Sequence, residues 1–136
     1  MSIAIHVAED AHEIGSPSFF KSFFSTIVTH LEHGQLGARF PAVMRNLYSG
    51  AIAPDAAATA LEELRQIRTE LARFPPQDVV WDFEDRNARP PWGDRISPQI
   101  TSLANYYVTS DGKDLFDVLI EALSLAVKSG KGAHIQ

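Results

Sequence analysis

The chain has 136 residues, of which 45% are hydrophobic and 21% charged, as in an ordinary soluble protein of one domain. Its net charge of −5 disfavours nucleic acid as a partner, because such binding depends on Lys and Arg neutralising phosphates. The absence of cysteine excludes disulfides, zinc–thiolate sites and thiol nucleophiles.

The N-terminal residues carry neither the basic region nor the apolar run of a signal peptide. No stretch approaches the ~20 apolar residues of a membrane span. We therefore expect a cytoplasmic protein that has no membrane contact. The sequence also predicts no cofactor.

The first third of the chain predicts a strand and a helix. Residues 2–8 alternate between apolar and small or polar side chains, which indicates a half-buried strand, and a polar stretch follows. Ser16 can cap a helix whose first position is Pro17, and this helix ends at Gly34. Four phenylalanines in its first half make it the expected central helix of the domain.

Two further helices are predicted before residue 76. Pro41 starts a short helix that ends near Tyr48. Pro54 opens a long amphipathic helix, and Pro75-Pro76 ends it because the second proline disfavours helical geometry at the first.

The last part of the chain predicts a strand, a loop and a helix. VVWDF, residues 79–83, alternates and predicts a strand with Trp81 in the core, and EDRNARPPWGDR, residues 84–95, predicts a polar loop. Residues 99–109 fit a helix by spacing or a strand by composition. A helix then spans residues 115–127, capped by Asp111 or Asp114, and residues 130–136 are expected to be a frayed tail.

These elements together predict an α+β fold. We expect a single domain over residues 1–136, with its core in residues 3–129. A small sheet of about three strands would pack against three to four helices.

The nearest approach to a metal motif is HLEH, residues 30–33. Zinc peptidases of the H-x-x-E-H type place two histidines four residues apart, whereas His30 and His33 are three apart. Both lie in the last turn of a predicted helix, where histidine simply complements the helix dipole. We therefore predict no metal site.

Acidic residues gather around the 84–95 loop: Asp82, Glu84, Asp85 and Asp94. Such carboxylates could serve as general acid and base, but Arg86, Arg89 and Arg95 lie close in sequence and would keep them ionised. No nucleophile motif, dinucleotide motif or phosphate-binding loop is present. A solvated loop or a binding surface therefore fits better than a catalytic site.

Trp92 lies in PPWG, where two prolines stiffen the backbone. A tryptophan held in this way either packs over the domain as a lid or is offered to a partner. Tryptophan and arginine are the residues most enriched in interface hot spots.

GSPSFFKSFFSTI, VVWDFEDRNARPPWG and ITSLANYYVTSDGKDLFDVL resemble segments of the immunity protein 70 family of bacterial polymorphic toxin systems. The resemblance spans about residues 3–127. It implies a non-enzymatic protein that binds a cognate secreted or contact-delivered toxin domain and protects the producing cell. It carries over no binding residues.

We therefore expect an immunity protein, monomeric or weakly dimeric, that occludes its toxin. From their chemistry we expect the contact residues to be Asp82, Glu84, Asp85, Arg89, Trp92 and Asp94. If the toxin were a nuclease, an acidic partner would suit its basic groove.

Two alternatives remain open from the sequence. One is a small enzyme that uses carboxylates, or His30 and His33 with a metal. The other is a regulatory or structural module that associates with itself through Phe19, Tyr106 and Tyr107.

Overall fold

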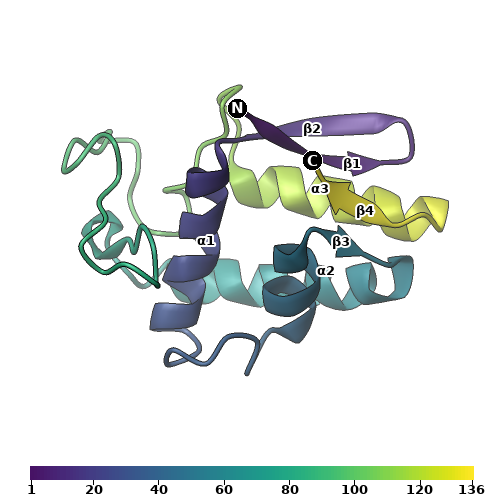
Figure 1. Ribbon diagram of the computed structural model, residues 1–136, viewed down its shortest axis with the longest axis horizontal. Helices are drawn as coiled ribbons and strands as arrows, with labels where there is room; N and C mark the ends of the chain where they lie inside the picture. The colour runs from purple at the N-terminus through teal and green to yellow at the C-terminus, as the bar shows by residue number, and fades with distance from the viewer.

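The computed structural model describes all 136 residues and shows one four-stranded antiparallel sheet with its helices on one side (Figure 1). The strands lie in the order β2-β1-β4-β3. Their bounds are Ile3–Val7 for β1, Asp10–Gly15 for β2, Ala51–Ile52 for β3 and Ala133–Ile135 for β4. The α+β class is confirmed, with four strands where about three were expected.

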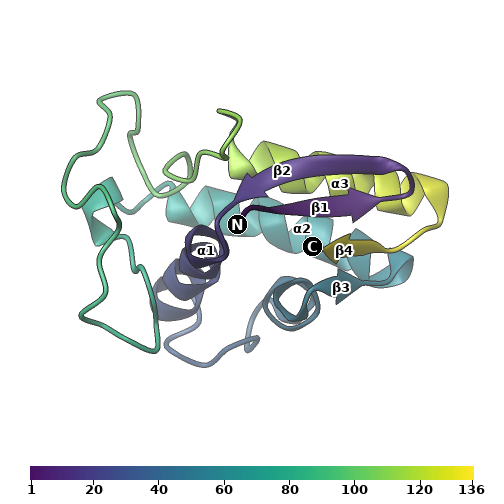
Figure 2. The same ribbon diagram turned by 45° about the horizontal axis from the view of Figure 1, so that its top comes forward.

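Three α-helices carry most of the core: α1 (Pro17–His30), α2 (Pro54–Leu71) and α3 (Leu115–Ser129). A π-helical turn, η1 (Ala42–Leu47), and a short 3₁₀ turn, η2 (Pro76–Asp78), complete the set. Helices α2 and α3 lie side by side behind the sheet, and α1 crosses at one end (Figures 1 and 2). No helix is both long and apolar enough to cross a bilayer.

The helices begin where the capping residues predicted. Ser16 Oγ accepts a hydrogen bond from Phe19 N at 3.1 Å, and Pro17 occupies the first helical position. Asp114, rather than Asp111, caps α3 by accepting from Phe116 N at 2.8 Å. The short helix expected from Pro41 is η1, and its first N–H groups are bonded by Glu63 from α2.

The predicted frayed tail is wrong. Residues 133–135 form β4, which lies inside the sheet between β1 and β3. Ala4 and Gln136 exchange two main-chain hydrogen bonds of 3.1 and 3.0 Å, which extend this pairing. Gly132 permits the chain to pass close to β3, since a Cβ there would stand 2.8 Å from the Ile52 carbonyl oxygen.

The predicted strand over residues 79–83 is also wrong, and so is its burial pattern. Val80 is the buried residue of the segment, whereas Val79, Trp81 and Phe83 are half-buried. The ambiguous residues 99–109 form turns and a single β-bridge, Val108 with Asp114. The sheet instead recruits the polar stretch of residues 10–15, because β1 offers it a partner through a two-residue turn.

Candidate functional site

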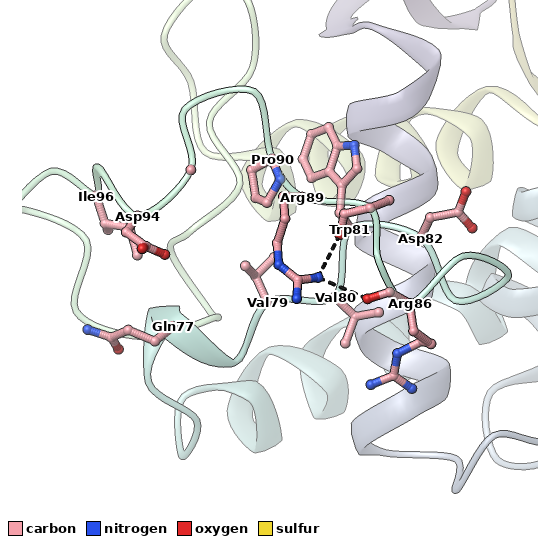
Figure 3. A pocket seen from close by; sticks show the side chains of 12 residues that line it. Gln77, Val79, Val80, Trp81, Asp82, Arg86, Arg89, Pro90, Asp94 and Ile96 are labelled. Carbon is pink, nitrogen blue, oxygen red and sulfur yellow. Dashed lines mark hydrogen bonds between the residues drawn. The ribbon is translucent and has the colours of Figure 1, made fainter.

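A cleft of about 390 Å³ lies within residues 77–96 (Figure 3). This segment forms the end of the molecule beyond α1 (Figure 1). Arg89 extends through the middle of the cleft, beside Trp81 (Figure 3). Its guanidinium donates to the carbonyl oxygens of Arg86 at 2.9 Å and Ala88 at 3.1 Å. The cleft is therefore lined by an aromatic face and by a cation that the loop itself holds in place.

The wall of the cleft is anchored to α1 by buried hydroxyl groups. Val80 N donates to Thr26 Oγ1 at 3.0 Å, and Val80 O accepts from Ser22 Oγ at 2.9 Å. Tyr107 Oη lies 2.6 Å from Thr26 Oγ1 and donates to the Ser22 carbonyl at 2.9 Å. Because these hydroxyls satisfy the main chain of Val80, the segment needs no neighbouring strand.

Tyr107 is buried, and burial raises the pKa of its phenol well above the ordinary value. Its proton is therefore retained at physiological pH and remains available to the Ser22 carbonyl. The three hydroxyls and the Val80 main chain form a polar connection through an otherwise apolar region. This connection sets the position of the cleft relative to α1.

Lys21 of α1 neutralises two of the predicted contact residues. Its ammonium lies 2.6 Å from Glu84 and 3.3 Å from Asp82. The main-chain N–H of Glu84 donates to the Asp82 carboxylate, and this hydrogen bond is the main reason why the pKa of Asp82 lies below its usual range. The nearby Lys21 ammonium lowers this pKa further. Asp82 is therefore ionised, as expected, but Lys21 rather than a loop arginine is the partner.

Arg86, Arg89 and Arg95 pair with no carboxylate. In number, however, these three arginines and Lys21 equal the four acids Asp82, Glu84, Asp85 and Asp94. The surface around the cleft is close to neutral, although the chain as a whole is acidic.

The structure brings together some of the predicted contact residues. Asp82, Arg89 and Asp94 line the cleft, whereas Glu84 and Asp85 are exposed beside it. Asp85 Oδ1 accepts from Asn87 N at 3.1 Å and stabilises the turn that follows. Glu84 and Asp85 can therefore meet a partner only at the rim of the cleft.

Trp92 is both packed and exposed. Its ring lies edge-on to Trp81, with centroids 5.4 Å apart, and Nε1 donates to the Tyr106 hydroxyl at 2.8 Å. The side chain is still 39% exposed, which makes it one of the few large apolar residues at the surface. The sequence offered two alternatives for Trp92, packing over the domain or contact with a partner. The observed geometry allows both, because one part of the side chain is packed and another part is exposed.

The HLEH motif has a structural role. His30 Nε2 is hydrogen-bonded to the Asp78 carbonyl at 2.7 Å, and His33 is exposed. Glu32 is buried and accepts from the N–H groups of Gly37, Arg39 and Phe40 at 3.0 to 3.1 Å. No group of three or more His, Cys, Asp or Glu side chains is arranged to hold a metal ion.

The aromatic surface proposed for self-association is absent. Phe19, Tyr106 and Tyr107 are 8%, 4% and 1% exposed, so all three belong to the core. Their packing partners are aromatic neighbours within the chain, such as Phe23 for Tyr107. The sequence could not show this, because the partners come from other elements.

Sequence reasoning missed the residues that hold the site in place: Ser22, Thr26 and Tyr107. One signal was available, since hydroxyl residues interrupt the phenylalanines of SFFKSFFST on one helical face. Hydroxyls inside an apolar helix must find hydrogen-bond partners.

The residues around the cleft include no serine, threonine, lysine or histidine. Within this cleft no nucleophile is therefore paired with a base, and its one half-buried carboxylate, Asp82, is held ionised. Fold and site together define a small α+β domain with an aromatic and charged cleft. The chain belongs to the immunity protein 70 family, whose model matches residues 5–135. No curated protein and no solved structure matches the chain.

Proposed function

We propose that the protein binds a cognate toxin domain directly and neutralises it by covering the active site or the path of its substrate. Membership of the immunity protein 70 family supports this role. In this proposal the protein is not itself an enzyme, and it acts in the cytoplasm of the producing cell as a monomer or weak dimer.

We place the toxin contact on the loop that carries Asp82, Glu84, Asp85, Arg89, Trp92 and Asp94. The observation that carries this choice is Trp92, a large apolar side chain that is 39% exposed yet fixed by Trp81 and Tyr106. A rigid aromatic side chain loses little conformational entropy on binding, and such residues dominate interface energies.

Arg89 complements Trp92 in this proposal. Its guanidinium is held by two carbonyl groups in the cleft, and no acid of the chain neutralises it. It can therefore donate to a carboxylate or carbonyl of the partner. Because the surrounding surface is near neutral, affinity would come from packing and directed hydrogen bonds more than from long-range attraction.

The test is co-expression with the toxin domain encoded beside this gene. Growth should be restored, and a 1:1 complex should co-purify. Failure of both, with a protein shown to be folded by circular dichroism, would contradict the immunity role.

The binding face is tested by Trp92→Ala in the same assay. We expect Kd to rise about 30-fold, since a hot-spot tryptophan contributes roughly 2 kcal/mol or more. Val127→Ala is the matched control, because Val127 is 42% exposed on α3 and lies outside the loop. Equal affinities of the two variants would place the toxin on another face.

A further inference from the structure

Strand β2 forms one edge of the sheet and is largely uncovered. It pairs with β1 on one side. On the other side the chain supplies one hydrogen bond, from Ser110 N to the Ile14 carbonyl at 3.1 Å, near the end of the strand. The rest of this edge faces solvent.

The register identifies the free main-chain groups. Ala4 exchanges both of its main-chain hydrogen bonds with Gln136, so the N–H and C=O groups of Ala4 and His6 point toward β4. The N–H and C=O groups of Ile5 and Val7 therefore point toward β2. Their partners on β2 are His12 and Asp10. It follows that the N–H and C=O groups of Ala11 and Glu13 point away from the sheet.

Helix α3 runs beside this edge, as Figure 2 shows. Between the strand and the helix lies a hollow of about 450 Å³. Asp10 and His12 line it from β2, and Glu121, Ser124, Leu125 and Lys128 line it from α3. An edge strand with a helix alongside forms a groove in which an extended peptide can add to the sheet and place alternate side chains against the helix.

The excess of acidic side chains around the groove favours a basic occupant. Glu9, Asp10 and Glu13 lie along the edge, where His12 is the one basic side chain, and Glu121 adds a carboxylate from the helix. Lys128 is the one lysine or arginine in the hollow. A second copy of β2 would bring two sets of these carboxylates close together, which disfavours pairing, whereas a basic segment would meet opposite charge.

We propose that β2 accepts an extended, basic segment of another protein as a fifth strand of the sheet, with its helix-facing side chains in the hollow beside α3. The main chain of Ala11 and Glu13 would make the pairing hydrogen bonds. This surface lies on the β1–β2 hairpin, away from the 82–95 loop, so the inference does not depend on the proposed role of that loop (Figure 1).

The probe is a seven-residue peptide that alternates lysine and valine, titrated into the isotope-labelled protein and followed by NMR. We expect the amide signals of Ala11 and Glu13 to shift and their exchange with solvent to slow. Two control peptides accompany it: one with glutamate in place of lysine, and one N-methylated at alternate residues, which cannot form the main-chain bonds.

Two variants separate strand addition from general charge attraction. Ala11→Pro removes the outward N–H but no bond to β1, so the protein should keep its fold, as proline is tolerated on edge strands in this orientation. Ala11→Thr is the matched control, because it retains the N–H. We expect Ala11→Pro to lose at least tenfold in affinity and Ala11→Thr to lose less than threefold.

Charge is tested by Glu13→Lys, which should weaken binding of the lysine peptide even if Ala11→Pro proves unfolded. Equal binding of the N-methylated peptide, or shifts confined to residues other than 10–14, would overturn the proposal. A concentration-dependent dimer with protection at Ala11 would also overturn it, because the edge would then pair with a second copy.

Discussion

At the residue scale, single polar side chains organise backbone that belongs to no regular element. Glu32 accepts three main-chain N–H groups from residues 37–40, where the chain turns from α1 toward η1. Gly37 permits this turn through its positive φ of 81°, and a Cβ there would collide with Arg45. A motif that suggested metal chemistry in the sequence is thus a support for a loop.

We predict that Glu32→Ala destabilises the protein by about 3 kcal/mol, because it leaves buried N–H groups without an acceptor. Urea unfolding followed by circular dichroism measures the change. Glu62→Ala, at an exposed position of α2, is the control and should change stability by less than about 0.5 kcal/mol. A similar loss in both variants would show that the three hydrogen bonds contribute little.

At the element scale, the last strand joins the two ends of the sheet. Strand β4 pairs with β1 through residues 133–135 and with β3 through residues 133–134. Without it, β3 would have no strand partner, and the sheet would be reduced to the β1–β2 hairpin. A short C-terminal segment therefore completes the sheet.

We predict that deletion of residues 133–136 lowers the melting temperature by more than about 10 °C, because it removes a strand paired on both sides. Differential scanning calorimetry measures the shift. Gln136→Ala is the control, since it keeps the main-chain bonds to Ala4. A deletion variant that melts like the control would mean that β4 adds nothing to stability.

At the scale of the whole molecule, charge pairs connect elements that are distant in sequence. Arg39 forms a two-pronged ion pair with Glu70 of α2, at 2.8 and 2.7 Å, and also donates to the Leu31 carbonyl at the end of α1. These hydrogen bonds from Arg39 hold the pKa of Glu70 below its ordinary value of 4.5. The ionised form of Glu70 therefore stabilises the folded protein.

The sign of the pH dependence follows from this lowered pKa. A carboxyl group of this kind contributes stability above its unfolded pKa, near 4.5, and loses it as the pH falls through the lower folded value. We predict that Glu70→Gln lowers the melting temperature at pH 7 and that the difference from wild type narrows below pH 4.5. Melting curves from pH 7 to pH 3 measure it, and a constant difference would contradict the prediction.

Local patterns were sufficient where an element is stabilised within a few residues. Alternation predicted β1, and helical spacing predicted α1, α2 and α3, with a capping residue at the start of α1 and α3 and a proline at the start of α2. The family resemblance, carried by three quoted segments, was confirmed by the match over residues 5–135. The partner-binding role of the loop residues remains a prediction.

Only the tertiary structure decided which segments became strands and which conformation the loop around Trp92 adopts. Strands β2, β3 and β4 have weak patterns of their own and exist because neighbouring strands satisfy their main chains. Val80 has a strand-like sequence pattern but forms no strand, because hydroxyl groups of α1, rather than a neighbouring strand, bond its main chain. The sequence by itself determined the helices, the first strand and the α+β class, because hydrogen bonding within a helix is local. Pairing between strands, and the neutralisation of Asp82 by Lys21, depend on residues brought together only by folding.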